Sequence, residues 1–412
     1  MRLIYLLLFI SPQVLLYRYL WERLPNPTRP HQARIARVAL TVIFVVFNIP
    51  WIFVANRVLY GTVWAIGWIP FTGPWIAWQL LGWIFLTLVV LYVALKGALW
   101  VLGWIERRKL GHVDPVVEFE LSRAPAVQLT RRQFLARGTY AYAGLGAALS
   151  GYGIWSAYRL PVVTRRALTF PDLPAAFDGL RVAHLSDLHA GTHLGEDQMQ
   201  DIVAQVNAMR PDLILQTGDM IDISPDYISP YVRAFRELSA PLGCFTVLGN
   251  HDHYTGLEAV TRGVRDAGHV LVNNGCEMIE RGGAAIAVLG IDDPENWKND
   301  DPQEDYVDRA MRQAPPEAFK ILLAHRPGAW DSAVPRGIAL TLAGHIHGGQ
   351  FYLPVLGWSA GHLITKYVMG HFQRSQSQLY VSRGIGVVGV PIRVFVPPEI
   401  ELFELRRVAT RP

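Results

Sequence analysis

The sequence predicts two regions, an α-helical transmembrane region followed by a layered α/β sandwich that contains mixed sheets. The chain has 412 residues, about two to three times the usual length of one domain. Ten of its 13 tryptophans precede Arg159, whereas 11 of its 13 histidines lie between His184 and His371. Tryptophan favours membrane interfaces and histidine supports chemistry near neutral pH. We therefore expect the membrane region within residues 1–158 and the chemistry in the domain over residues 168–407.

The composition excludes several classes of protein. Hydrophobic residues make up 51% of the chain and charged residues 17%, which excludes a disordered or nucleic-acid-coating protein, so no nucleic acid is expected as a partner. The formal net charge of +4 is too small to indicate a polyanionic partner. The two cysteines, Cys244 and Cys276, lie at no metal-binding or disulfide-scaffold spacing.

Four apolar segments predict the transmembrane region. A helix needs about 20 residues to span the hydrocarbon core, so the second and third segments qualify and the other two are marginal. The alternative for the middle pair is a buried helix of a soluble domain, and a signal-like or interfacial helix also fits the first. The segments are Leu3–Tyr17, Val38–Val54, Pro74–Ile105 and Gly138–Tyr158.

The distribution of positive charge predicts the topology of a multi-pass protein of the cell membrane. Five arginines separate the first two segments, seven basic residues separate the last two, and only Arg57 lies in the middle loop. Basic loops stay in the cytoplasm, so the catalytic domain is expected to be extracytoplasmic. Thr130–Ala136 (TRRQFLA) is typical of a twin-arginine signal, which makes the twin-arginine export machinery an expected partner. Arg159, Arg165 and Arg166 on the outer side oppose this orientation.

The second half of the chain alternates between strand-like and helical runs. Helical runs cover Glu196–Met209 and Ser229–Leu238 between the first strands, and later strands follow one another at shorter intervals. This order predicts a layered sandwich with mixed sheets. The expected strands are Arg181–Leu185, Leu213–Gln216, Phe245–Leu248, Ala284–Leu289, Lys320–Ala324, Ile338–Ala343, Leu379–Ser382 and Glu399–Leu405.

Five of these strands are followed by polar motifs that can bind a metal. Loops at the carboxyl ends of strands are where α/β folds place ligands and catalytic groups. One Asp-x-His or His-x-His motif alone is more often a turn or a surface pair, but five such loops in succession predict a site. The motifs are Ser186–His189, Gly218–Asp222, Gly249–Asp252, Ala324–Arg326 and Gly344–Gln350.

The residue types in these motifs indicate the kind of metal. Aspartate, histidine and asparagine supply oxygen and nitrogen ligands without a thiolate, which suits Mn, Fe, Zn or Mg. In extended backbone, residues two apart point to the same side. Asp187 can therefore converge with His189, and His345 with His347, each pair on one centre.

The order of these motifs resembles that of the calcineurin-like metallophosphoesterase superfamily over about Leu168–Leu405. The motifs Leu379–Gly386 and Pro391–Arg393 are similar to those of its bacterial membrane-associated or twin-arginine-exported branch. The resemblance implies an αββα sandwich with two divalent metal ions, expected to be Mn, Fe or Zn. It implies that the first ion is bound by Asp187, His189 and His347, the second by Asn250, His325 and His345, and both by Asp219.

The same resemblance implies that His251 is a catalytic residue that does not bind metal. A leaving oxygen needs a proton or a hydrogen bond, and histidine is suited to supply it. Asp252 either orients the imidazole, as a second catalytic residue, or holds a turn. Asp222 is interpreted as an acid that either supports a neighbouring site residue or holds a turn, rather than as a ligand. Arg326 either binds a substrate phosphate or forms a local salt bridge. The residues that bind substrate stay unknown.

These observations predict a membrane-anchored phosphohydrolase. Its expected substrate is a phosphorylated small molecule or lipid with a phosphoester or pyrophosphate bond. Phe351–Met369 is unusually apolar for a loop beside the metals, and either packs in the core or faces the bilayer or an acyl chain. The alternative function is a membrane sensor or scaffold whose phosphoesterase-like domain binds metal without turnover.

Overall fold

The computed structural model describes residues 13–21, 37–42, 44–45, 82, 131–293 and 304–408. The chain divides into two compact units, Met1–Ala148 and Leu149–Pro412. Most of the first three apolar segments, and most of the loops on which the predicted topology depends, lie outside the described residues. The fold is therefore described for the second unit and for helix α5 (Arg131–Tyr158), which leads into it.

The fourth apolar segment, Gly138–Tyr158, forms the greater part of α5. Over the described ranges, no helix is both long enough and apolar enough to cross a membrane.

The first sheet of the second unit has six strands in the order β1-β14-β2-β3-β4-β5. It is mixed, because β14 runs antiparallel to β2 while the other neighbours are parallel. The strands are β1 (Val162–Phe170), β2 (Leu180–Leu185), β3 (Leu213–Thr217), β4 (Cys244–Val247), β5 (Val270–Leu271) and β14 (Glu399–Arg407).

The second sheet also has six strands, in the order β12-β13-β9-β8-β7-β6. Its four central strands are parallel, and the two edge strands are antiparallel to their neighbours. A separate short hairpin joins β10 (Tyr352–Leu353) to β11 (Trp358–Ser359). The strands of the sheet are β6 (Gly275–Arg281), β7 (Ala284–Gly290), β8 (Phe319–Leu323), β9 (Leu340–Ala343), β12 (Gly370–Arg374) and β13 (Ser377–Val381).

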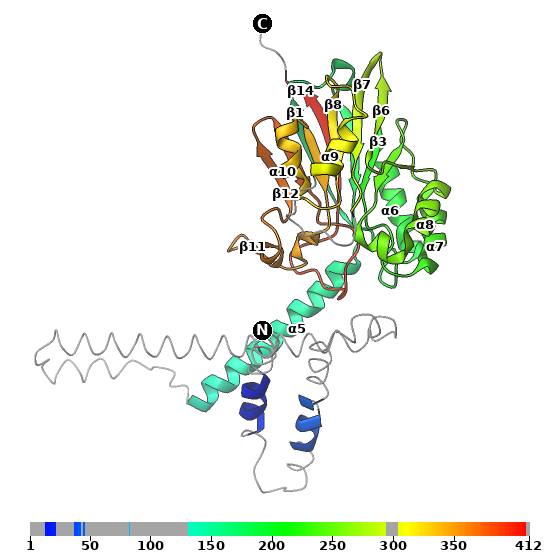
Figure 1. The fold of residues 1–412 in the computed structure, drawn as a ribbon. Helices are drawn as coiled ribbons and strands as arrows, with labels where there is room; N and C mark the ends of the chain where they lie inside the picture. Colours follow the sequence, from blue (N-terminus) through cyan, green and yellow to red (C-terminus); the bar gives the residue numbers. More distant parts are fainter. Residues whose placement is uncertain are drawn as a thin grey trace, which may run out of the picture. The chain divides into compact units, whose positions relative to one another are not determined.

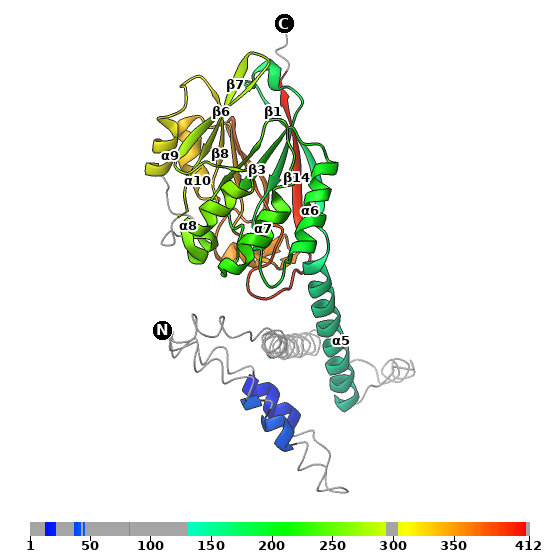
Figure 2. The same cartoon turned by 90° about the vertical axis from the view of Figure 1, so that its right-hand side faces the viewer.

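Helices cover the outer faces of the two sheets, as Figures 1 and 2 show. Three helices pack on the first sheet, and two helices pack on the second. The layers confirm the expected α/β sandwich with mixed sheets. The helices are α6 (Glu196–Ala208), α7 (Ile228–Phe235), α8 (Asn250–Asp266), α9 (Glu304–Met311) and α10 (Ala329–Ala333).

A continuous apolar core fills the space between the sheets. Val182, Leu215 and Val247 of the first sheet belong to the same buried cluster as Ile321 and Leu342 of the second. Valine, isoleucine and leucine are typical of strands that are buried on both faces. Runs of these residues made the strands recognisable in the sequence.

Strand β1 begins before the expected start of the domain at residue 168. All nine of its residues pair with β14, from Val162 opposite Glu399 to Phe170 opposite Arg407. The sequence pattern did not predict β1, β6 or β12 as strands.

The end of α5 packs against a loop that follows the second sheet. The Arg393 backbone amide donates to the Gly153 carbonyl at 2.9 Å. The rings of Tyr152 and Phe395 lie 5.4 Å apart. Residues 152–158 are therefore part of the α/β unit.

Candidate active site

The predicted metal ligands all follow strands that end at the same edge of the sandwich. Strands β2, β3 and β4 are parallel neighbours in one sheet, and β8 and β9 are parallel neighbours in the other. Because parallel strands direct their carboxyl ends to the same edge, the loops that follow them meet. In the first sheet these loops carry Asp187, His189, Asp219 and Asn250, and in the second His325, His345 and His347.

One group of donor atoms forms around Asp187, His189 and His347. The Asp187 Oδ1 and His347 Nε2 atoms are 3.3 Å apart. The Nε2 atoms of His189 and His347 are 3.1 Å apart. All three side chains are buried. This is the set that the resemblance assigns to the first ion.

A second group forms around Asp219, His325 and His345. His325 Nε2 lies 3.0 Å from His345 Nδ1 and 3.2 Å from Asp219 Oδ2. Asp219 Oδ2 also lies 3.4 Å from His189 Nε2 in the first group. One carboxylate oxygen of Asp219 therefore lies between the two groups.

These distances match those between ligands of one metal ion. Donor atoms held about 2.1 Å from an ion lie about 3.0 Å apart at right angles and about 3.4 Å apart in a tetrahedron. The five distances just given span 3.0–3.4 Å. The residues therefore fit a divalent metal, and the absence of a thiolate from these groups suits Mn, Fe, Zn or Mg.

Asn250 offers a further oxygen atom to the site. Its side chain is buried, and among the described residues its Oδ1 has no hydrogen-bond partner. Asn250 is the first residue of α8. The next amide, of His251, donates to Asp219 Oδ1 at 2.8 Å. A buried amide oxygen without a partner is costly, and a cation beside Asp219 would satisfy it.

The electrostatics of the site favour added positive charge. Burial alone would raise the pKa of Asp187 and Asp219, but the neighbouring histidines lower both, so both carboxylates are ionised in the core. Burial lowers the pKa of His325, yet Asp219 and Asp187 raise it to about 10. Buried negative charge must be compensated by positive charge. Protonated histidines compensate it in part, and a divalent metal ion would compensate it more fully.

The backbone of the ligand loops is unusual. Five of the seven predicted ligands have a left-handed backbone, with φ of 47–69°: Asp187, His189, Asp219, His345 and His347. Residues other than glycine adopt this conformation in a few per cent of cases, and it persists where the surrounding structure holds it. The loops are therefore shaped to direct their side chains inward, at a cost in backbone energy.

A glycine beside the ligands permits close approach between the two sheets. A Cβ atom at Gly344 would lie 1.9 Å from Ser186 Oγ and 2.1 Å from Asp187 Oδ2. The next amide, of His345, donates to the Asp187 carboxylate at 2.9 Å. Any side chain at residue 344 would push the loop after β9 away from the loop after β2.

His251 lies beside the first donor group without belonging to it. Its ring packs edge-on against that of His189, with 4.6 Å between centroids. Its Nδ1 donates to the Asp222 backbone carbonyl at 2.9 Å and lies 3.1 Å from Asp222 Oδ1. Burial lowers the pKa of His251, but Asp219 and Asp222 outweigh it and raise the pKa to about 9. The imidazole is thus held by Nδ1.

Asp252 does not orient His251. Its buried carboxylate accepts hydrogen bonds from the backbone amides of Asp219, Met220, Ile221 and Gly249, at 2.8–3.2 Å. This corrects the assignment of Asp252 as a catalytic residue in favour of its alternative as a turn-holding acid. Asp222 lies beside the imidazole instead, in the supporting role that was one of its two expected alternatives, and its Oδ1 also lies 3.4 Å from His189 Nδ1.

Two further residues support the ligand loops. Arg326 Nε donates to Asp293 Oδ1 at 2.7 Å, so the local salt bridge forms. Arg393, fully buried, donates to the Gly386 and Arg383 carbonyls at 3.1 and 2.8 Å, and its Nη2 lies 3.2 Å from His347 Nδ1. Asp293 follows strand β7, as the other motifs follow theirs, so the same rule would have found it.

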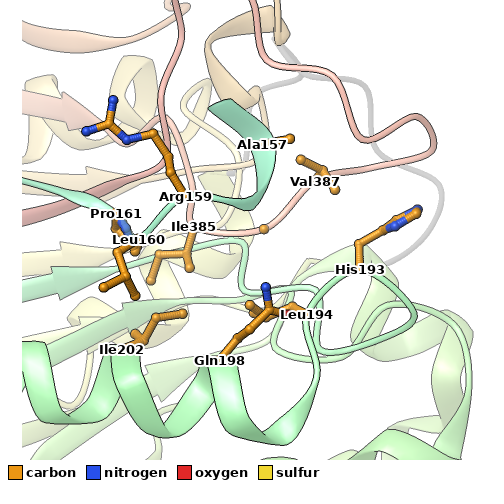
Figure 3. Close-up of a pocket in the computed structure, with 11 residues that line it drawn as sticks. Ala157, Arg159, Leu160, Pro161, His193, Leu194, Gln198, Ile202, Ile385 and Val387 are labelled. Carbon is orange, nitrogen blue, oxygen red and sulfur yellow. The ribbon is translucent and has the colours of Figure 1, made fainter. Parts of the chain in front are cut away.

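A pocket adjoins the ligand loops at the end of α5 (Figure 3). It lies between residues 157–161, the start of α6 and the loop after β13. Leu160, Ile202 and Ile385 line it, together with Arg159 and His193. A Cβ atom at the adjoining Gly386 would lie 3.1 Å from His189 Cβ, so this loop separates the pocket from the first donor group.

Comparison with known proteins agrees with this arrangement. Residues 180–349 match the family model described as calcineurin-like phosphoesterase. The chain is 30% identical to the Bacillus subtilis uncharacterized metallophosphoesterase YkuE over 293 residues, which cover 68% of this chain and 98% of that protein.

Two other relatives carry similar names. A Danio rerio transmembrane protein with metallophosphoesterase domain is 30% identical over 325 residues, covering 77% of this chain and 71% of that protein. An uncharacterized metallophosphoesterase of Helicobacter pylori is 31% identical over 228 residues, covering 55% and 60%. With ligand-type side chains gathered at one edge of a mixed-sheet sandwich, these similarities show that the chain belongs to the calcineurin-like metallophosphoesterase family and is a metal-dependent phosphoesterase.

Proposed function

We propose that this phosphoesterase holds two divalent metal ions and hydrolyses a phosphoester or pyrophosphate bond of a lipid-linked substrate at a membrane. The observation that supports two ions is the position of Asp219 Oδ2, 3.4 Å from His189 Nε2 and 3.2 Å from His325 Nε2. One oxygen shared by two donor groups is the arrangement expected of a bridging ligand.

The first ion would be held by Asp187, His189 and His347, and the second by Asn250, His325 and His345, with Asp219 bridging them. Bound divalent ions lower the pKa of water and neutralise phosphoryl oxygens. His325 donates from Nδ1 to the Thr217 carbonyl at 2.8 Å, which directs its Nε2 at the site, where a metal ion would replace the proton.

His251 is proposed to give a proton or hydrogen bond to the leaving oxygen. Because Asp222 engages its Nδ1, the free ring nitrogen is Nε2. The ring is partly exposed, with 15% of the side chain accessible, whereas His189 behind it is buried. A substrate can therefore reach His251 from solvent.

The membrane anchor is proposed from two observations. Val38–Val54 carries no charge and Pro74–Ile105 carries one, so both are suited to span a bilayer. The Danio rerio relative is named a transmembrane protein. We also propose a multi-pass topology of the bacterial twin-arginine-exported branch, with the catalytic domain outside the cytoplasm. A site anchored in this way meets lipid-linked phosphates in two dimensions.

The hydrolase is tested on the purified full chain with added Mn or Zn. We expect hydrolysis of p-nitrophenyl phosphate or its bis-ester. Asp219→Asn and His251→Gln should each reduce kcat by about 10²–10⁴-fold. Only Asp219→Asn should also lower the metal content, because His251 is not a ligand.

The matched control is Asp266→Asn, an exposed aspartate at the end of α8, which should leave activity unchanged. Elemental analysis should find two metal ions per chain, and a single ion would contradict the dinuclear centre. Bound metal without turnover of any phosphoester would favour the sensor or scaffold instead. A screen of lipid extracts, with phosphate or headgroup release as the readout, then tests the substrate class.

The topology is tested by reporter fusions at Arg166. Activity of a phosphatase reporter that works only outside the cytoplasm, lost when Arg131 and Arg132 are replaced by lysine, would support export. Fluorescence of a cytoplasmic reporter at the same position would overturn the external placement.

A further inference from the structure

The segment after the metal ligand His347 ends in an exposed aliphatic tip. We use this term for Val355, Leu356, Leu363 and Ile364, which are 97, 72, 79 and 56% exposed. The first two lie in the turn between β10 and β11, and the others lie at the end of the 3₁₀ helix Ala360–Leu363. Aliphatic side chains exposed in this concentration indicate a surface that is covered in the working protein.

The aliphatic tip is tied to the rim of the active site. Ser359 Oγ donates to the Gly348 carbonyl at 2.6 Å, one residue beyond His347. The Tyr352 amide donates to the Val394 carbonyl at 3.0 Å, so the hairpin is fixed to the loop that also contacts α5. The tip therefore has a defined place relative to the metal ligands.

A second apolar surface lies on the end of α5. Ile154, Trp155, Tyr158 and Leu160 are each 44–58% exposed. The Arg159 guanidinium lies 5.1 Å from the Trp155 ring centroid. Tryptophan and tyrosine beside arginine are typical of the headgroup region of a bilayer.

Both surfaces lie at the same end of the α/β unit. In Figure 1 the hairpin labelled β11 and the last turns of α5 lie at the end opposite the β6–β7 turn. The contact of Arg393 with Gly153, and of Val394 with Tyr352, links them through one loop. The ligand loops open at this end as well, since they follow the carboxyl ends of β2, β3, β8 and β9.

We infer that this end of the domain docks on the surface of a phospholipid bilayer, with the aliphatic tip inserted and Trp155, Tyr158 and Trp358 at the headgroup level. The inference rests on the anchored, lipid-directed hydrolase proposed above and identifies the surface that brings its site to the membrane. The segments that we propose as anchors, Val38–Val54 and Pro74–Ile105, lead along the chain into α5. A protruding aliphatic turn is suited to lipid, whereas protein interfaces favour aromatic and arginine side chains in packed pockets.

The test places nitroxide labels on the full chain in nanodiscs of phosphatidylcholine and phosphatidylglycerol. Cys276 is replaced by serine, and Cys244 stays because it is buried and burial raises its pKa to about 12. Labels are attached at Val355→Cys and Leu363→Cys, with Glu280→Cys on β6 as the exposed control. Power saturation compares collisions with oxygen, which enters lipid, and with a water-soluble nickel chelate.

We expect the labels at 355 and 363 to collide at least several-fold less with the nickel chelate, relative to oxygen, than the label at 280. Equal ratios at all three positions would overturn the docking surface. Labels shielded from both reagents would also overturn it, because that result indicates a protein partner such as a second copy of the chain.

A paired variant separates this inference from the proposed function. Val355→Asp with Leu363→Asp should bring a label at Leu356→Cys to the ratio seen at 280, while hydrolysis of the soluble p-nitrophenyl ester and metal content stay unchanged. A chain that turns over no ester but still immerses its labels would contradict the hydrolase and leave the docking surface intact. A chain that hydrolyses the ester with labels in water would contradict the docking surface alone.

Discussion

At the scale of single residues, the two aspartates near His251 have separate tasks. Asp222 contacts the imidazole through its carbonyl and its carboxylate, 2.9 and 3.1 Å from Nδ1. Asp252 instead accepts hydrogen bonds from four backbone amides and so fixes the turn that carries Asp219. Replacing Asp222 should mainly disturb the orientation of the His251 imidazole, and replacing Asp252 should mainly disturb the metal site.

Asp222→Asn should lower kcat by about 10- to 100-fold because it loosens the orientation of His251, and it should lower metal content less than Asp252→Asn, because its only other contact with the site is with His189 Nδ1 at 3.4 Å. Asp252→Asn should instead lower metal content and stability, because an amide nitrogen cannot accept the backbone donors. Steady-state kinetics and elemental analysis of both variants check this. Equal loss of metal in the two would contradict the separate tasks.

His269 makes the stability of the fold sensitive to acid. Its Nε2 donates to the Phe235 carbonyl at 3.1 Å, and its Nδ1 accepts from Gln216 at 3.1 Å and Tyr231 at 3.3 Å. A second proton would face those donors. Burial lowers the pKa of His269 to about 4, although the Phe235 carbonyl opposes the shift.

Because the folded pKa lies below the unfolded value of about 6.5, the neutral ring contributes its full stability above pH 6.5 and loses it as the pH falls toward 4. Between pH 7 and pH 5 the free energy of unfolding of the natural chain should fall by about 2 kcal/mol more than that of His269→Gln, because glutamine does not titrate. Urea unfolding at both values measures this. An equal loss of unfolding free energy in His269→Gln and the natural chain would show that His269 is not the source of the acid sensitivity.

At the scale of elements, Arg393 organises the loop after β13. Its guanidinium donates to the carbonyls of Arg383, Gly384, Gly386 and Val396. Lysine keeps the charge but not the planar set of donors. Arg393→Lys should therefore lower the free energy of unfolding by about 2–4 kcal/mol. Arg236→Lys, on an exposed residue, is the control, and equal stability of the two variants would show that the charge alone is enough.

The sequence predicted the central strands and missed those at the edges. Every residue of β3 and β8 is buried, so their apolar runs are continuous. β1, β6 and β12 contain VVTRRALTF, GCEMIER and GHFQR, and each lies at the edge of its sheet. An edge strand needs no apolar pattern because one side and much of one face meet solvent.

The part of the site that was predictable from the sequence consists of residues that directly follow a strand. The five motifs were found because each follows a recognisable strand, and the family resemblance selected seven ligands from them. The structure brings six of these residues into two donor groups, and Asn250 precedes the residue whose amide donates to Asp219. The sequence left two roles open for each of Asp222 and Asp252, since both are polar residues in a ligand loop. Which of them reaches His251 depends on the turn at the start of α8.

At the scale of the whole molecule, the donor groups join the two sheets. Asp219 follows β3 of the first sheet, and His325 follows β8 of the second. A bound ion would therefore hold together the layers that the apolar core also joins. Chelation should lower the melting temperature of the α/β unit by about 5–15 °C, the effect expected of a ligand at 100–1,000 times its Kd.

Thermal scans with and without chelator measure this, and adding Mn or Zn back should restore the original temperature. His251→Gln should show the same response as the natural chain, and Asp219→Asn a much smaller one. A melting temperature indifferent to chelator would contradict a bridging role for the metal.

The left-handed backbone at five of the predicted ligands has a consequence for attempts to improve the protein. Glycine adopts that conformation readily, so replacing His189 by glycine would relieve backbone strain, and replacing Asp219 by glycine would also remove a buried charge. A directed-evolution campaign that selected heat-resistant clones in cation-free medium would enrich glycine at those codons. The selected proteins would be heat-resistant and well expressed, but they would lack residues of the metal site and would be inactive.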